Sequence, residues 1–339
     1  LKRMKKSLLF ILSCYCVAWT HAQGLHFSQF YNAPLLVNPA NAALMPEDDY
    51  RIGINYRTQW STVPVPYKTA SFYADLQLLR NKLSTNWIGL GIANFNDKAG
   101  DGNLVLNKTQ FSLAYHIVLN DFNMLSFGAS GGFVQRNMDF NRLSFDTQWD
   151  GYSFNPLNSN GEKNGVIKTA YFDLCAGINY AYMPADNSYL KIGLGLSHIN
   201  RPVESFNNDN NQLGIRPNAQ IEWVYQPTSR VILTPSLYFA SQKSASELLA
   251  GFLTQTYLSG DNETKSELIL GCYYRLNESV IAVVGYQIAK LKFVVSYDVT
   301  MSALTPANRS MGAFELGIVY QGMYHAPNGN RSEYGCPRF

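Results

Sequence analysis

The stretch "LKFVVSYDVTMS", residues 291–302, alternates strongly apolar side chains with less apolar ones. One face carries Leu291, Phe293, Val295 and Tyr297, and the other carries Lys292, Val294, Ser296 and Asp298. Strict alternation over this length predicts a β-strand with one apolar and one mixed face. The apolar face could contact a protein core, as in a soluble β-sandwich, or lipid, as in an outer-membrane barrel. The rest of the sequence favours lipid.

The same alternation recurs from residue 50 onward, with hardly any helical periodicity between the segments. Strands that cross a membrane in a barrel need about 9–11 residues, whereas strands of soluble proteins usually have about 5–6. Closure into a barrel also removes the exposed sheet edges that so many strands would otherwise leave. The sequence therefore predicts an all-β fold, a transmembrane antiparallel β-barrel of about 14 strands over residues 50–321. The predicted strands, each of 9 to 12 residues, are 50–58, 69–77, 86–95, 109–119, 124–135, 170–181, 188–198, 217–226, 230–241, 246–256, 266–276, 279–288, 290–299 and 312–321.

The connections between these strands alternate in length up to about residue 240. The first, third, fifth and seventh are longer, and the longest of them is 136–169. Long extracellular loops that alternate with short periplasmic turns are typical of outer-membrane barrels. An even number of strands brings both ends of the barrel to the same side. We therefore expect a periplasmic N-terminal segment at 23–49 and a periplasmic C-terminal tail at 322–339.

The first 22 residues predict a secretory signal peptide. Basic residues at positions 2, 3, 5 and 6 precede the apolar run 7–19, and "THA" (20–22) offers a cleavage site before Gln23. One alternative is a lipoprotein signal acylated at Cys14. Another is a membrane anchor, although the apolar run is too short to cross about 30 Å of hydrocarbon. Export of a β-barrel implies that it resides in the outer membrane and contacts its lipid.

Composition agrees with a surface that is not wholly in water. Charged residues make up 15% of the chain, against about 25% in a typical soluble domain. The net charge of +3 is too small to indicate nucleic acid as a partner. After the signal peptide, Cys175, Cys272 and Cys336 remain, an odd number that implies no disulfide framework.

The motifs that could carry chemistry lack the context that the chemistry needs. "GASGG" (128–132) matches the G-x-S-x-G pattern of hydrolases, but Ser130 lies in mid-strand and not between a strand and a helix. "DKAGDGN" (97–103) lacks the carboxylates of a calcium loop, and the histidines have no metal-ligand spacing. The sequence therefore predicts no enzyme, no catalytic residue, no cofactor and no metal.

Six short strings resemble the PorP/SprF family of the type IX secretion system, which occurs in gliding and protein-secreting Bacteroidetes. In chain order they are "NPANAAL" (38–44), "YRTQW" (56–60), "LSHINRP" (196–202), "LGCYYRLNESVIAVVGYQ" (270–287), "SYDVTMS" (296–302) and "CPRF" (336–339). The resemblance implies a non-enzymatic outer-membrane component that works with periplasmic ring components. It also implies a role in secretion and surface anchoring of a cargo or adhesin protein, with a link to gliding motility. Nothing in the sequence separates general translocation from the display of one adhesin.

Other functions stay open. A porin or solute channel could line its pore with Lys191, Glu222 and Asp298. A soluble periplasmic β-protein is a further alternative, and an enzyme ranks last. Ion conductance and membrane partitioning discriminate among these classes.

Two regions are candidates for partner binding. The segment 136–169 holds Trp149, Tyr152 and Phe154 among polar residues, and exposed aromatics in long loops often form binding hot spots. The alternative is that this loop folds into the barrel mouth as a plug. The chain ends in Cys336, Pro337, Arg338 and Phe339, which could dock a periplasmic ring protein or serve as an assembly signal on the barrel rim.

Overall fold

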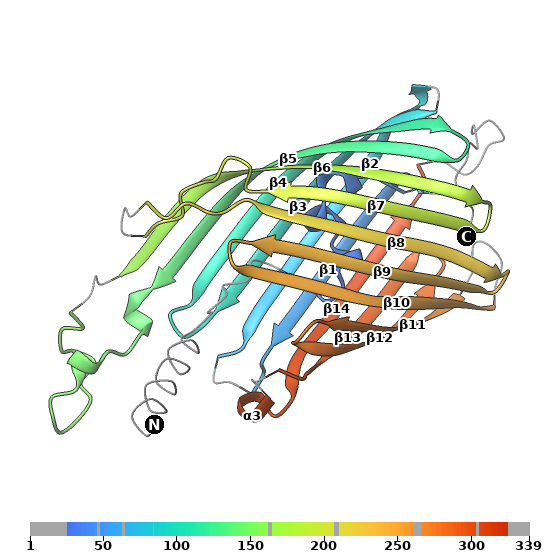
Figure 1. Cartoon of the computed structure of the whole chain (residues 1–339). Helices are drawn as coiled ribbons and strands as arrows, with labels where there is room; N and C mark the ends of the chain where they lie inside the picture. The colour runs from blue at the N-terminus through green and yellow to red at the C-terminus, as the bar shows by residue number, and fades with distance from the viewer. Residues whose placement is uncertain are drawn as a thin grey trace, which may run out of the picture.

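The structure, a computed structural model, describes residues 26–45, 48–62, 65–83, 85–161, 165–206, 210–259, 266–302 and 305–324. The predicted signal peptide and the residues beyond 324 lie outside these ranges. Within them, fourteen strands pair antiparallel with their sequence neighbours, and β1 pairs with β14 to close the barrel (Figure 1). The predicted fold is confirmed.

Every predicted strand is present, and several are longer than the sequence indicated. The additions to β3, β4, β5 and β6 shorten the expected connections 96–108 and 136–169 to 100–103 and 140–165. The strands are β1 Tyr50–Gln59, β2 Tyr67–Leu83, β3 Asn86–Ala99, β4 Leu104–Asn120, β5 Asn123–Asp139, β6 Val166–Ala185, β7 Ser188–Ser197, β8 Arg216–Thr228, β9 Val231–Gln242, β10 Ala245–Ser259, β11 Ser266–Arg275, β12 Ser279–Ile288, β13 Leu291–Thr300 and β14 Met311–Gly322.

The two faces of the wall have opposite character. On β13, Phe293, Val295 and Tyr297 are exposed, while the alternate residues Ser296 and Asp298 are buried. The same division runs around the barrel, with apolar side chains outside and many polar side chains buried inside. An apolar outer surface of this extent is stable in lipid and not in water. The prediction that the apolar face of 291–297 points outward, toward lipid, is confirmed.

The barrel has two distinct ends. At the terminal end, β1 begins, β14 finishes, and short turns such as 121–122 and 289–290 join the strands. The loop end carries the connections 140–165, 198–215 and 301–310. These hold the short helices η3 (Phe140–Arg142), η4 (Asp146–Gln148) and α3 (Thr305–Asn308). Among the described residues, no helix is long and apolar enough to span a membrane.

The lumen contains the segment that precedes β1. Residues 26–45, called the plug below, form η1 (Phe30–Asn32), α2 (Pro34–Val37) and η2 (Pro39–Asn41), drawn in blue between the strands in Figure 1. Each of α2 and η2 has a proline at its start, where a fixed φ and a missing N–H are tolerated. Sixteen of the twenty plug residues are buried, and the other four are half-buried. The segment expected at 23–49 beside the barrel therefore lies inside it over its described residues 26–45.

Leu194 on β7 tests which face meets lipid. Its side chain is 52% exposed on the outer surface. Leu194→Arg should destabilise the inserted barrel by about 2–4 kcal/mol, because a charge at mid-depth in lipid is unfavourable. We expect less folded protein in the outer membrane, measured by heat-modifiable electrophoretic mobility, and little change for Leu194→Ile.

The inward neighbour Gly195 is not a permissive site for comparison. A Cβ there would lie 2.7 Å from Asn218 Oδ1, so Gly195→Arg should also impair assembly. Unchanged assembly of Leu194→Arg would show that β7 faces the other way.

Candidate functional site

Apolar clusters hold the plug against opposite sides of the wall. Phe30 and Val37 pack into a cluster formed largely by β9 to β13, where the Phe30 ring stacks on Tyr238 at a centroid distance of 5.3 Å. Phe27 and Leu35 pack with a second cluster on β2 to β4 that includes Phe95. Burial of these side chains away from water stabilises the docked plug through the hydrophobic effect, which does not depend on bond direction.

Two wall glycines let the plug backbone approach the strands. A Cβ at Gly89 would lie 2.0 Å from the carbonyl oxygen of Ala42, and a Cβ at Gly128 would lie 2.3 Å from the nitrogen of Ala40. Both clashes are with backbone, which cannot rotate away as a side chain can. Gly128 belongs to the "GASGG" string, so this string serves backbone packing in a strand. Its Ser130 is buried in the middle of β5 and not at a turn from a strand into a helix, unlike the nucleophile of a hydrolase.

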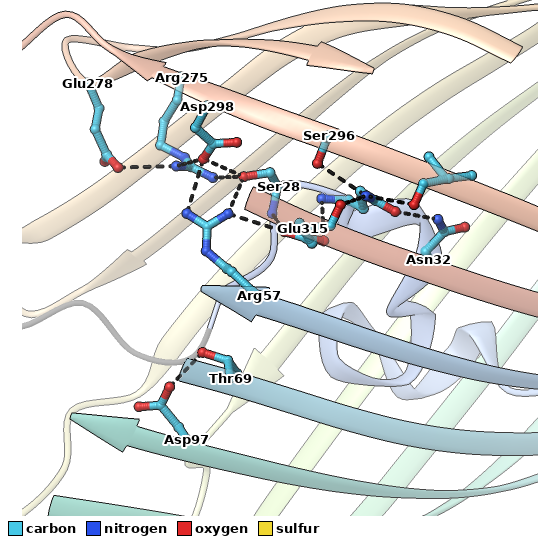
Figure 2. Close-up of polar contacts among 12 residues, drawn as sticks. Ser28, Asn32, Arg57, Thr69, Asp97, Arg275, Glu278, Ser296, Asp298 and Glu315 are labelled. Carbon is cyan, nitrogen blue, oxygen red and sulfur yellow. Dashed lines mark hydrogen bonds and ion pairs between the residues drawn. The ribbon is translucent and has the colours of Figure 1, made fainter. Parts of the chain in front are cut away.

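A group of four charged side chains lies buried toward the loop end of the lumen. This charge cluster consists of Arg57 on β1, Arg275 on β11, Asp298 on β13 and Glu315 on β14 (Figure 2). Asp298 accepts from both arginines at 3.0 and 3.2 Å, and Glu315 lies 3.1 Å from Arg57. All four are at most 2% exposed. Each charge depends on the others, because a buried charge without its partner is strongly destabilising.

Ser28 of the plug lies at the centre of the charge cluster. Its hydroxyl oxygen accepts hydrogen bonds from Arg57 Nη1 at 2.6 Å and Arg275 Nη2 at 2.9 Å, and its hydroxyl donates to Asp298 Oδ2 at 2.7 Å (Figure 2). The backbone N–H groups of Ser28 and Gln29 donate to the two carboxylate oxygens of Glu315 at 2.8 and 3.0 Å. The first residues of the plug thus contact both cations and both anions.

Further titratable groups surround the charge cluster. Arg275 also lies 3.1 Å from Glu278 and 3.0 Å from Glu247. The pKa of His26 on the plug is lowered, first because the imidazole is buried and then because both arginines are near, while Glu247 opposes this shift. The neutral imidazole is therefore the favoured form of His26 beside the two guanidinium groups.

The asparagines of "NPAN" (38–41) bind the middle of the plug to β6, β7 and β8. Asn38 Nδ2 donates to the carbonyl oxygens of Ile178 at 3.2 Å and Leu194 at 3.1 Å. Asn41 Oδ1 accepts from Asn179 at 3.0 Å and from Gln220 at 3.1 Å. Buried amides are stable only when bonded in this way, and here they fix the plug's rotation within the lumen.

Near the terminal end the wall holds the backbone of the plug. Asp75 accepts from the N–H of Ala43 at 2.7 Å and pairs with Arg51 at 2.6 Å. Trp87 Nε1 donates to the Ala43 carbonyl at 3.0 Å. His116 Nε2 lies 2.9 Å from the Ala42 carbonyl, and since a carbonyl oxygen only accepts, this nitrogen carries the proton. The plug is therefore bonded along its full length.

The structure pairs two of the three candidate aromatics of the 140–165 connection and leaves the third, Tyr152, in the turn between them. Trp149, Tyr152 and Phe154 are 56%, 97% and 45% exposed, and Trp149 pairs with Phe154 in an isolated antiparallel bridge. The Asp150 carboxylate accepts from the N–H groups of Ser153 and Tyr152, and these bonds lower its pKa. The three aromatics stay exposed at the loop end, and the lumen is filled by residues 26–45 instead. Cys336, Pro337, Arg338 and Phe339 lie outside the described residues.

The two arginines of the charge cluster were not predicted from the sequence. Asp298 was expected on the inner face, but no role was predicted for Arg57 or Arg275. The available signal was that both lie within the strings "YRTQW" and "LGCYYRLNES", just as Asp298 lies within "SYDVTMS". The pore charges of the channel alternative, Lys191 and Glu222, pair with each other at 3.1 Å. In the described ranges, no three His, Cys, Asp or Glu side chains group as metal ligands.

A substitution at Gly128 tests whether the plug can dock only where the wall has no side chain. Gly128→Val should displace Ala40 and reduce plug docking by about 1–3 kcal/mol, the usual effect of overpacking. We expect faster hydrogen–deuterium exchange across residues 26–45, measured by mass spectrometry on the folded barrel. Gly131→Val is the matched control, because Gly131 lies on the same strand and its Cβ would meet only the Phe172 side chain. Equal exchange in the two variants would contradict the assignment.

Two comparisons place the chain among known proteins, and no curated protein matches it. The toluene transporter TbuX of Ralstonia pickettii is 12% identical, with a TM-score of 0.53 over 87% of this chain and 94% of that chain. The deltaS2 mutant of the TodX monoaromatic hydrocarbon channel is 10% identical, with a TM-score of 0.55 over 87% and 94%. Such low identities show a shared fold alone. A family model described as "Type IX secretion system membrane protein PorP/SprF" matches residues 20–320. The chain therefore belongs to the PorP/SprF family of type IX secretion system membrane proteins, and it is an outer-membrane β-barrel.

Proposed function

We propose that this protein is a non-enzymatic component of the type IX secretion system that supports secretion and surface anchoring of a cargo or adhesin protein. Family membership supports the secretion role. The observation that carries the proposal is the plug. A lumen occupied by the protein's own chain fits a protein that anchors a partner better than it fits an open pore. Four buried charges and Ser28 hold this plug in place.

The orientation of the barrel follows from its connections. Long loops of outer-membrane barrels face the cell exterior, and short turns face the periplasm. The loop end, with Trp149, Tyr152 and Phe154, is then available to cargo. The terminal end faces periplasmic ring components, and the sequence Cys336–Phe339 would act there as a docking or assembly element. A link to gliding motility would follow if the cargo is an adhesin.

A test compares cells that lack the protein with cells that carry the double variant Trp149→Ala and Tyr152→Ala. Loss of the protein should abolish cargo display on the surface, measured by labelling of intact cells. The double variant should lower display about tenfold or more, because an exposed aromatic anchor can contribute 2 kcal/mol or more to binding. Phe122→Ala, at the opposite end of the barrel, is the control for a lost exposed aromatic.

The outcomes separate the two parts of the proposal. Unchanged display in cells without the protein contradicts the secretion role. Normal display by the double variant alone contradicts only the role of the aromatic loop.

A second candidate function is an outer-membrane channel. The similarity to barrels named as a toluene transporter and a hydrocarbon channel favours it at the level of the fold. Transport through this lumen would require the plug to move. The two candidate functions therefore differ in whether plug movement opens a conducting path.

A disulfide between plug and wall discriminates the two candidates. A Cβ at position 91 would lie 3.5 Å from the Cβ of Ala42, within the range of about 3.5–4.5 Å found in disulfides. The double variant Ala42→Cys and Gly91→Cys, with other cysteines removed, should cross-link on oxidation. We expect low conductance in planar bilayers in both redox states. Conductance that appears on reduction and stops on oxidation, with no change in the single-cysteine variants, would favour the channel.

A further inference from the structure

A cavity of about 410 Å³ lies at the loop end of the barrel, among the β1–β2, β3–β4 and β5–β6 connections. Cavities that hold small organic molecules commonly have volumes of about 300–1,000 Å³. The lining includes Val65 before β2, Lys98 on β3, Asp101 and Asn103 in the β3–β4 connection, and Arg142 and Leu143 in the β5–β6 connection. None of these residues belongs to the plug, the charge cluster or the three exposed aromatics.

Contacts within the chain fix the walls of this cavity. The N–H of Asp139 donates to the carbonyl oxygen of Gly102 at 2.8 Å, and the N–H of Phe140 donates to that of Gly165 at 3.1 Å. The Leu143 side chain lies against Gly102, where an added Cβ would be 3.2 Å from Leu143 Cδ2. The β3–β4 and β5–β6 connections are therefore held together by the protein itself, and such preorganisation reduces the conformational entropy lost on binding.

Two cations of the lining have no counter-ion. Within the described ranges, neither Lys98 nor Arg142 forms an ion pair or a side-chain hydrogen bond. Lys68 lies directly opposite Lys98 in the β2–β3 pairing, and both project from the outer face of the wall. Like charges opposite each other destabilise a pair of strands. A bound anion would offset this repulsion and give the cations of the cavity a partner.

Two hydrogen-bond acceptors share the cavity with these cations. Asn103 Oδ1 is buried and has no partner among the residues that the structure describes, and the Asp101 carboxylate is exposed. Both can accept from hydroxyl groups, whereas a fatty acid would leave the Asn103 oxygen without a donor. Val65 and Leu143 add apolar surface on which the C–H groups of a sugar ring can pack. The lining therefore suits a molecule with a negative charge, several hydroxyl groups and C–H faces, which is the chemistry of an acidic or phosphorylated sugar.

The cavity lies beyond the apolar belt of the barrel. On the outer face of β3, Leu90 and Ile92 are exposed, and Asn94 and Asn96 separate them from Lys98. The six residues from Ile92 to Lys98 span about 20 Å along the strand. In the orientation proposed above, this level is outside the hydrocarbon, where the sugars of outer-leaflet glycolipids lie. A sugar carried by a membrane lipid would therefore reach the cavity without leaving the membrane surface.

We propose that this cavity binds a sugar that bears a phosphate or carboxylate group, carried by a glycolipid of the outer leaflet. Lys98 and Arg142 bind the anionic group, and Lys68 adds positive potential beside them. Asp101 and Asn103 accept hydrogen bonds from the hydroxyl groups. The site is independent of the secretion role, since it uses none of the residues proposed for plug retention or partner contact. Its occupation would fix the loop end against the sugar layer of the membrane.

Binding is measured by isothermal titration calorimetry on the full chain, folded in detergent and verified by heat-modifiable mobility. The probe is the oligosaccharide of the host lipopolysaccharide, deacylated so that its phosphates and carboxylates remain. The comparison probes are a neutral oligosaccharide of similar length and inorganic phosphate. We expect each of these to bind at least about tenfold more weakly, because the first lacks the charge and the second lacks the hydroxyl and C–H contacts.

Substitutions in the cavity identify the site. Lys98→Gln combined with Arg142→Gln should weaken binding of the acidic oligosaccharide by about tenfold or more, because hydrogen bonds to charged groups are the stronger ones. Asn103→Gly should weaken it by about threefold, since an acceptor is lost while glycine tolerates the positive φ of 48° at this position. Lys168→Gln is the matched control, because Lys168 is an exposed lysine on the outer face of β6 that does not line the cavity. Equal affinity of the double variant and the control would overturn the proposal, and so would inorganic phosphate that binds as tightly as the oligosaccharide.

A second measurement distinguishes the source of the sugar. Native mass spectrometry of the barrel extracted from outer membranes should show bound intact glycolipid, which the double variant loses and Lys168→Gln retains. If the deacylated oligosaccharide binds but the extracted barrel carries no glycolipid, the assignment to a membrane lipid is overturned in favour of a free polysaccharide. Neither measurement involves cargo, so a failure here is distinct from a failure of the secretion role, which is measured by display on cells.

Discussion

The rest of the structure depends on the pairing of two arginines that are buried inside the barrel. Arg57 and Arg275 are at most 2% exposed, and unpaired guanidinium groups at such positions would be strongly destabilising. Asp298 and Glu315 supply the opposite charges, but the arrangement is complete only when Ser28 adds its hydroxyl and N–H groups (Figure 2). The wall therefore has a physical reason to keep the plug, beyond the burial of apolar surface.

The plug and the barrel depend on each other in a second way. A wall whose inner face carries buried amides and carboxylates needs partners for them, because unsatisfied buried polar groups are costly. The plug supplies these partners through its main chain, which its short helical turns leave free to bond outward. The barrel in turn shields an apolar, proline-containing segment that could not form a membrane strand. The polar residues of the inner wall and the apolar residues of the plug are therefore each accounted for by their contacts with the other part.

Four of the six strings that carry the family resemblance supply the plug or the wall around it, whereas "LSHINRP" spans the end of β7 and the connection after it, and "CPRF" lies outside the described residues. "NPANAAL" forms the middle of the plug, and "YRTQW", "LGCYYRLNES" and "SYDVTMS" supply Arg57, Arg275 and Asp298. These four strings thus contribute residues to the occupied lumen. The exposed aromatics of the 140–165 connection stand apart from it, at the loop end. The contacts that retain the plug and the loop that we propose for partner binding thus belong to different regions of the molecule.

The sequence by itself determined the class of fold. Alternation in segments such as 291–299 sets which side chains face lipid, and this local periodicity needs no knowledge of other strands. It also placed Asp298 on the inner face. The location of residues 26–45 could not be read in the same way, because an apolar segment with prolines suits a periplasmic cap and a lumen plug equally well. Only closure of β1 onto β14 brings Arg57 beside Asp298 and Glu315 and leaves a space for Ser28. The contacts of Arg57 with Asp298 and Glu315 join residues more than two hundred positions apart, and such contacts leave no periodic signal in the chain.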